Sequence, residues 1–168
     1  MALTARGRVD GLLRYELGAQ ACPIIADLVE GALWVRGPAG ACVIEAADCR
    51  VDPRGLWGPD PAALAPLARA IEQDRGRADR EVRENYKALT ERARPQDVRA
   101  VVSEQAAFSA ERETLCRSYA REASHGFCNA RFTQARAAQL AARLGGTPAP
   151  AVPRPRRASP ITPAPHQE

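Results

Sequence analysis

Residues 105–144 read QAAFSAERETLCRSYAREASHGFCNARFTQARAAQLAARL, and this stretch decides the predicted fold. On both sides of its centre, apolar and small side chains recur every three or four residues, which is the spacing of one helix face. The segment 120–127 interrupts this pattern and contains Gly126, so it predicts a turn between two helices. Cys116 and Cys128 lie on either side of that turn, in the arrangement that a disulfide would join. The alternative is that all five cysteines stay reduced, as in a cytosolic protein.

Another predicted helix precedes this pair. Asp60 followed by Pro61 is typical of a helix start, because Asp caps free N–H groups and Pro has no N–H to leave unsatisfied. One apolar stripe continues from there to about Arg94, and Pro95 starts the next helix. Short connections make neighbouring helices antiparallel. We therefore predict an all-α fold, a small antiparallel three-helix bundle with a disulfide between its second and third helices.

The two ends of the chain differ from the predicted helical domain, which spans residues 49–146. Residues 1–48 show no sustained hydrophobic period, so we expect an irregular N-terminal segment, either an atypical leader or short helices. Their most apolar stretch is too short and too charged to span a membrane. Residues 147–168 are rich in proline and carry three arginines, which predicts a disordered basic tail. The pairing of Cys22, Cys42 and Cys49 stays open.

Few residues are suited to catalysis or to metal binding. The chain has two histidines, His125 and His166, and no C-x-x-C motif, which argues against a zinc site and against most acid–base mechanisms. A nucleophilic pair of His125 with a nearby cysteine is conceivable, but no third orienting group is present. Glu111 and Glu113 lie on different faces of one predicted helix and do not form a converging acid–base pair. We predict no catalytic residue, no cofactor and no metal ion.

The charge pattern argues against nucleic acid as a partner. The formal net charge is +4, from 24 basic and 20 acidic residues, and both signs alternate along the predicted helices. This alternation is typical of a solvated helix surface, whereas nucleic-acid interfaces usually gather positive charge and aromatic side chains on one face. We therefore expect a protein partner. The oligomeric state is not predicted.

The spacing within 105–140 resembles that of a known family. A Gln is followed three positions on by an aromatic residue, then by an Arg and a Cys at intervals of four. A Gly-containing turn, a second Cys and an Arg-x3-Leu ending complete the pattern. It resembles the C-terminal half of the LprI-like lysozyme-inhibitor domain. The matching residues are Gln105, Phe108, Arg112, Cys116, Gly126, Cys128, Arg136 and Leu140.

This resemblance implies an exported bacterial protein whose helices are held by disulfides and which inhibits lysozyme. The expected location is the periplasm or the cell envelope. Residues 1–48 contain no recognisable signal peptide, and the cytoplasm is the alternative location. The cysteine pair that the family usually carries before its tyrosine-containing helix has no counterpart here, and Cys49 is the nearest cysteine.

The leading functional hypothesis is a non-enzymatic envelope binding protein that inhibits lysozyme by steric occlusion of its cleft. Lysozymes are commonly cationic, so an acidic patch on the inhibitor would speed the encounter. The candidate residues for such a patch are Glu104, Glu111, Glu113 and Glu122. Ordinary helix surface is the alternative interpretation of these glutamates.

Two other functions remain open from the sequence. The first is a small structural or assembly subunit that docks a larger complex through its helical bundle and Pro-rich tail. The second is a cytosolic protein associated with nucleic acid. Thiol state distinguishes the envelope protein from the cytosolic one, because cytosolic cysteines are kept reduced.

Overall fold

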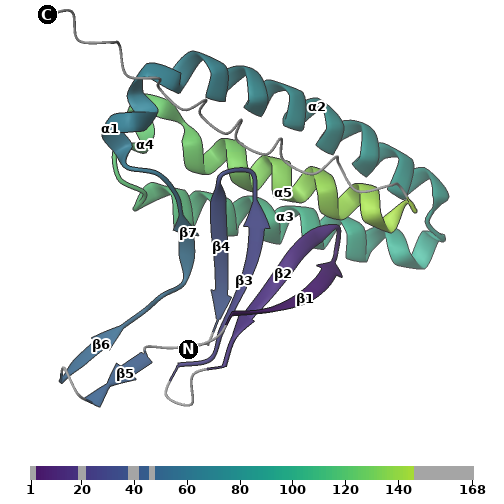
Figure 1. The fold of residues 1–168 in the computed structure, drawn as a ribbon. Coiled ribbons are helices and arrows are strands. Elements are labelled where there is room, and N and C mark those ends of the chain that lie inside the picture. The colour runs from purple at the N-terminus through teal and green to yellow at the C-terminus, as the bar shows by residue number, and fades with distance from the viewer. Residues whose placement is uncertain (1–2, 19–21, 38–41, 46–47, 146–168) are drawn as a thin grey trace, which may run out of the picture.

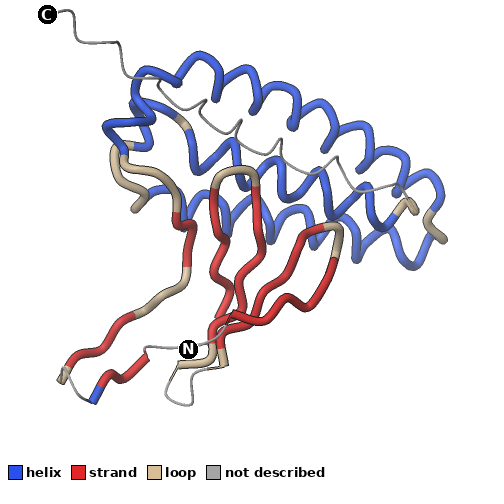
Figure 2. The backbone as a smooth tube through the Cα atoms, in the orientation of Figure 1, coloured by secondary structure: helices blue, strands red, loops and turns tan. Residues whose placement is uncertain are grey.

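The computed structural model describes residues 3–18, 22–37, 42–45 and 48–145. The described chain has an N-terminal part made of strands and a C-terminal part made of helices (Figure 2). The predicted disordered tail, residues 147–168, lies outside the described residues. The predicted domain boundary between residues 48 and 49 stays a prediction.

The N-terminal part is an antiparallel sheet with a separate two-stranded ribbon. The sheet has the strand order β1-β2-β3-β4-β7, and β5 pairs only with β6. The sheet strands are β1 (Leu3–Val9), β2 (Leu12–Leu17), β3 (Ile24–Val29), β4 (Ala32–Gly37) and β7 (Gly55–Trp57). The ribbon strands are β5 (Cys42–Ile44) and β6 (Cys49–Val51). A Cys22–Cys42 disulfide ties the ribbon to the segment before β3.

The all-α prediction is therefore wrong, and the predicted irregular N-terminal segment is a sheet. The turns of the β1–β2 and β3–β4 hairpins fall at residues that favour tight turns. Asp10 and Gly11 both have positive φ, of 50° and 79°, and Gly31 has a φ of 68°. Two-residue hairpin turns of this kind require positive φ, which glycine adopts at little cost and aspartate tolerates.

The C-terminal part contains three long helices and three short helical turns. The elements are α1 (Pro61–Leu64), the 3₁₀ turn η2 (Ala65–Leu67), α2 (Ala68–Arg92), α3 (Pro95–Arg117), α4 (Glu122–His125) and α5 (Phe127–Arg143). The Asp60 side chain caps α1 by accepting a hydrogen bond of 2.7 Å from the backbone N–H of Ala62. Pro66 falls in the 3₁₀ turn, where a missing N–H is tolerated.

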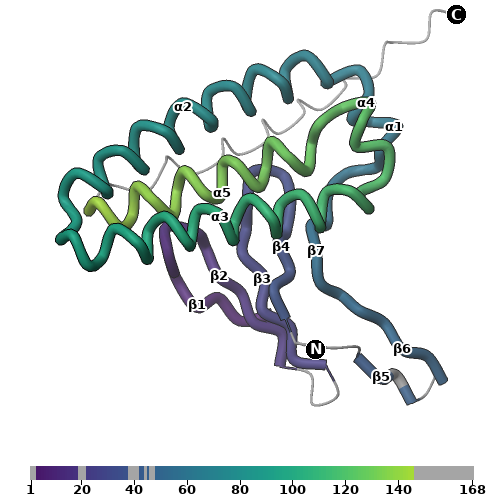
Figure 3. The backbone as a smooth tube through the Cα atoms, turned by 180° about the vertical axis from the view of Figure 1, so that it is seen from behind, coloured from purple at the N-terminus to yellow at the C-terminus, as the bar shows by residue number. Residues whose placement is uncertain are grey.

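The central element is α5, which touches both layers of the molecule. It packs against α2 and α3 on one side, and the β1–β2 and β3–β4 turns meet it on the other (Figures 1 and 3). A Cβ at Gly11 would lie 2.6 Å from the Ala138 carbonyl oxygen, so the first turn rests directly on the helix backbone. At the second turn, the Gln134 side chain donates a hydrogen bond of 2.9 Å to Glu30. The sheet therefore stands with its turn ends against α5.

The core lies where these turn ends meet the helices. Trp34 of β4 packs edge-on against Phe132 of α5, with ring centroids 4.7 Å apart. The same buried cluster contains Leu12, Val29, Phe108, Cys116, Cys128 and Ala135. Helix residues that the sequence predicted to form a purely helical core thus also pack against side chains of the sheet.

The Cys116–Cys128 disulfide joins α3 to α5, with the short α4 between them. It does not link the second and third helices of a simple bundle, as the fold prediction had it. The reason is that short helices precede α2 and separate α3 from α5. Among the described residues, no helix combines the length and the apolar character that a membrane span requires.

Candidate functional site

The corner formed by α3, α4 and α5 holds the two motif cysteines. Cys116, near the end of α3, is bonded to Cys128 in the first turn of α5, with the Cα atoms 5.5 Å apart. Both residues are buried. Arg121 and Gly126 adopt left-handed backbone conformations on either side of α4, which lets the chain reverse direction in a short segment. The disulfide therefore fixes the crossing of α3 and α5 at this end.

His125 lies at the same corner, and both of its ring nitrogens are bonded to the backbone. Nε2 lies 3.0 Å from the carbonyl oxygen of Ala120, and the backbone N–H of Phe127 donates to Nδ1 over 3.1 Å. Both ring nitrogens are therefore occupied by the local backbone. Cys116 and Cys128 are already bonded to each other. The nucleophilic pair considered from the sequence is therefore not assembled.

Glu122, one of the four glutamates predicted to contact a partner, caps the start of α5. Its carboxylate accepts hydrogen bonds from the backbone N–H groups of Cys128 (2.9 Å) and Asn129 (2.8 Å). The side-chain amide of Asn129 donates a third, of 2.8 Å. A carboxylate at a helix N-terminus satisfies free N–H groups and interacts favourably with the helix dipole. Glu122 is 12% exposed at its side chain and is committed to this local structure.

The other three predicted partner contacts lie along α3. Glu104 pairs with Arg143 of α5, and Glu113 pairs with Arg117 one turn further along α3, at 3.1 Å. Glu111 is exposed, and no ion pair connects it to another described residue. Since arginines neutralise two of these carboxylates, the described surface does not gather the four glutamates into one acidic patch.

The remaining motif residues meet between α3 and α5. The buried ring of Phe108 has the guanidinium groups of Arg112 and Arg136 at 5.8 Å and 5.5 Å from its centroid. Arg136 donates from Nε to the Gln105 side chain over 3.0 Å, and Arg112 donates from Nη1 to the Thr133 hydroxyl over 3.0 Å. Burial lowers the pKa of Arg136. Cation–π contacts and hydrogen bonds to neutral acceptors therefore hold these two arginines in the helix interface.

The last two motif residues also serve the helix geometry. Leu140 is fully buried in α5. Gly126 ends α4 with a φ of 64°, a conformation that a residue with a Cβ adopts only with strain. Most of the motif side chains thus lie in the packing between α3, α4 and α5 and are not on the exposed surface.

The sequence interpretation missed an ionic network that crosses the sheet. Asp27 of β3 is fully buried, and Arg14 of β2 donates two hydrogen bonds to it, of 2.7 Å and 2.9 Å. Arg36 of β4 lies 2.6 Å from the same carboxylate and stacks over Trp34, 3.7 Å from the ring centroid. The hydrogen bond to Asp27 raises the pKa of Arg14. The Asp10-Gly11 turn between apolar runs was the signal that could have found this sheet.

No side-chain cluster in the described part of the chain is suited to a metal ion, since no three His, Cys, Asp or Glu residues converge there. Apart from the exposed Glu111, the charged side chains described above are paired with one another, with polar side chains or with the backbone. Their arrangement supports packing and recognition, and it offers no assembled acid–base or nucleophilic machinery among the described residues.

Comparison with known proteins identifies the helical part of the chain. The family model described as lysozyme inhibitor LprI matches residues 61–140, from the start of α1 into α5. The match spans slightly less than half of the chain and leaves out the sheet and the ribbon. No curated protein and no solved structure gives a significant match. The predicted resemblance is confirmed over this range, since residues 61–140 are similar to the lysozyme inhibitor LprI family.

Proposed function

We propose that this protein is a non-enzymatic inhibitor of a lysozyme-type glycosidase and that it acts outside the cytoplasm. The observation that carries the proposal is the match of residues 61–140 to the lysozyme inhibitor LprI family. The Cys22–Cys42 and Cys116–Cys128 disulfides support an oxidising compartment, because disulfides persist there and are rare in the cytosol. The hydrogen bonds of His125 to the backbone are consistent with a structural role for this side chain in a binding protein.

The proposed mechanism is steric occlusion of the substrate cleft of the enzyme. A binding surface that is already rigid loses little conformational entropy when it docks. Here the disulfide and the two arginines stacked on Phe108 hold α3 against α5. The turns at Gly11 and Glu30 hold the sheet against α5. The inhibitor would therefore present a preformed body to the cleft.

A cell-wall lysis assay tests this function. The full-length, oxidised protein is added in increasing amounts to lysozyme and a suspension of bacterial cell walls, and clearing of the suspension is followed. We expect the rate of clearing to fall to a low plateau as the protein is added. Removal of residues 147–168 should leave this inhibition intact. Unchanged clearing at a large molar excess of the folded protein would refute the proposed function.

A second candidate function is a small assembly subunit, and a feature of the sheet favours it. Side chains alternate between the two faces of a strand, so the face opposite to Trp34 carries Leu33, which is paired with Trp57. Leu33 and Trp57 are exposed by 37% and 57% on that face, and Leu3, exposed by 58%, lies on β1 at the other edge of the sheet. Apolar side chains gathered on a surface mark an interaction site. If this function holds, the wild-type protein co-purifies with a larger complex and does not inhibit lysozyme. The Trp57→Ser variant then no longer co-purifies with that complex.

A further inference from the structure

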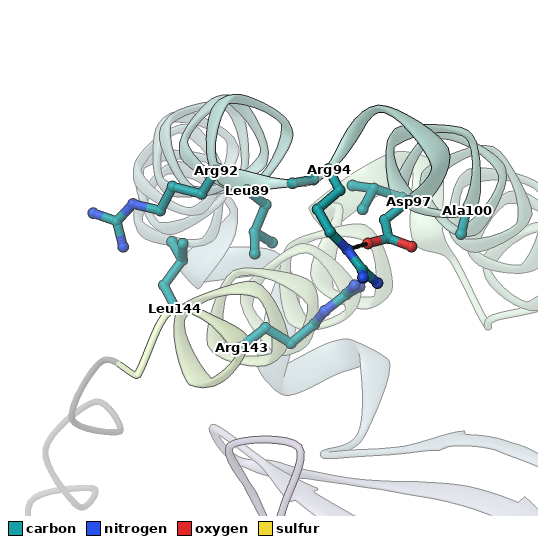
Figure 4. Close-up of a pocket in the computed structure, with 9 residues that line it drawn as sticks. Leu89, Arg92, Arg94, Asp97, Ala100, Arg143 and Leu144 are labelled. Atoms are coloured by element: carbon teal, nitrogen blue, oxygen red, sulfur yellow. Dashed lines mark hydrogen bonds and ion pairs between the residues drawn. The ribbon is translucent and has the colours of Figure 1, made fainter.

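A pocket of about 510 Å³ lies at the end of the helical layer farthest from the disulfide. It is bounded by the connection between α2 and α3 and by the last turn of α5 (Figure 4). None of the residues of the family motif lines it. Its volume is within the range of about 300–1,000 Å³ that is typical of small-molecule sites.

The floor of this pocket is apolar. Leu89 from α2, Val101 from α3 and Leu144 from the end of α5 line it, together with Ala93 and Ala100. Val101 is buried, with 3% of its surface exposed. A ligand that covers this floor would remove apolar surface from water, which favours binding.

The rim of the pocket is positively charged. Arg92, Arg94 and Arg143 line it, and Arg94 and Arg143 point toward one another in Figure 4. Against these three guanidinium groups stand two carboxylates, Asp97 in the lining and Glu104 beside Arg143. One positive charge is therefore in excess. Within the described chain, the side chain of Arg92 makes no ion pair.

The ion pairs at the rim are of a kind that a ligand can displace. Arg94 lies 2.7 Å from Asp97, and these side chains are 73% and 45% exposed. The Arg143–Glu104 pair is also exposed, by 40% and 47%. Exposed ion pairs contribute little to stability, so redirecting their arginines costs little free energy.

Helix dipoles explain only part of this charge. Arg92 and Arg143 stand in the last turns of α2 and α5, where positive side chains are favoured. Arg94 precedes the N-terminal end of α3, where the dipole disfavours a cation. Its ion pair with Asp97 offsets this cost, and an anionic ligand would compensate the neighbouring guanidinium groups of Arg94 and Arg143 further.

We propose that this pocket binds a small amphiphilic carboxylate. The carboxylate is held between Arg94 and Arg143, whose planar guanidinium groups match it in a two-pronged hydrogen-bonding geometry. The apolar chain of the ligand covers Leu89, Val101 and Leu144. This binding site is separate from the proposed lysozyme inhibition, and neither depends on the other.

Titration of the full-length protein with octanoate, followed by amide chemical shifts, tests this site. We expect saturable shifts at Leu89, Val101 and Leu144. Acetate has the charge without the chain and octylammonium has the chain with the opposite charge, so both should bind at least about tenfold more weakly, since each lacks one of the two contributions.

Two variants and a matched control complete the test. Arg94→Gln and Arg143→Gln should each weaken octanoate binding roughly tenfold, because each removes a charge-assisted hydrogen bond. Arg117→Gln removes another exposed, ion-paired arginine outside the pocket and should leave the affinity unchanged. Amide spectra that are unchanged outside the pocket identify folded variants.

Three results would each overturn the proposal. The first is the absence of saturable octanoate binding to the wild-type protein. The second is equal affinity for octanoate and octylammonium. The third is wild-type affinity for octanoate in both pocket variants.

Discussion

At the scale of single residues, one carboxylate is fully buried in the sheet. Asp27 is fully enclosed between Arg14 and Arg36, so its charge is satisfied only by those two arginines. Removing one partner of a buried ion pair leaves the other without compensation, at a cost of about 3–5 kcal/mol. We therefore expect Asp27→Asn to lower the free energy of unfolding by about 3 kcal/mol or more, measured by urea denaturation.

The exposed pair in the same sheet is the control for this prediction. Arg6 and Glu16 lie 2.7 Å apart, but their side chains are 55% and 36% exposed. Glu16→Gln should cost less than about 1 kcal/mol, because solvent screens the interaction. Equal effects of Asp27→Asn and Glu16→Gln would show that the buried network contributes no more than a surface pair.

Single residues also show what sequence reasoning could recover. The LprI-like resemblance was evident from the spacing of eight motif residues, and four of them, Gln105, Phe108, Arg112 and Arg136, contact one another across one helix pair. The same spacing gave no indication that Glu122 turns inward to cap α5. A cap depends on where the chain reverses, and the length of α4 was not evident from periodicity.

At the scale of elements, the contact between the hairpin turns and α5 joins the two parts of the molecule. Gly11 and Gly31 occupy equivalent turns, and both have positive φ. A Cβ at Gly31 would meet nothing within 4 Å, whereas a Cβ at Gly11 would lie 2.6 Å from the backbone of α5. Gly31→Ala therefore reports backbone strain alone, and Gly11→Ala reports strain together with a clash.

We expect Gly31→Ala to lower the unfolding free energy by about 1 kcal/mol, the usual cost of a left-handed conformation with a Cβ. Gly11→Ala should cost about 1–3 kcal/mol more, because the helix backbone has to move away. Urea denaturation of both variants measures the difference. Equal losses would mean that the β1–β2 turn does not rest on α5 in solution.

The Cys116–Cys128 disulfide is a second link between elements, since it joins α3 to α5. It closes a loop of twelve residues' separation, for which the chain-entropy model gives a stabilisation of about 3 kcal/mol. The double variant Cys116→Ser/Cys128→Ser should lose about this amount in urea denaturation. Cys49 is a free cysteine, so Cys49→Ser should leave the midpoint unchanged. A double variant as stable as the wild type would contradict a structural role for this disulfide.

The elements also show why the sheet was not predicted. Near α5 both faces of the hairpins are apolar, so neighbouring residues such as Leu12 and Leu13 obscure the alternation that marks a strand. Farther out, one face carries Arg14 and Asp27 because they pair with each other across strands. Such pairing is defined by register, and the register follows from the turns, which hydrophobic periodicity does not report.

At the scale of the whole molecule, the distribution of charge bears on how an inhibitor would meet its target. The chain has a net charge of +4, and lysozymes are commonly cationic, so long-range attraction is absent. Salt screens the repulsion between like charges. We therefore expect the association rate with lysozyme to rise or stay level as ionic strength increases, measured by stopped-flow kinetics. A steep fall with salt would instead indicate an acidic docking face.

The measurement that tests the central claim most directly is steady-state kinetics of lysozyme on a soluble oligosaccharide substrate with increasing amounts of the oxidised protein. Covering the cleft excludes the substrate without changing the chemistry of enzyme that has bound it. The account therefore predicts a rising apparent KM and a constant kcat. A falling kcat at constant KM, or kinetics that do not respond to the protein, would contradict it.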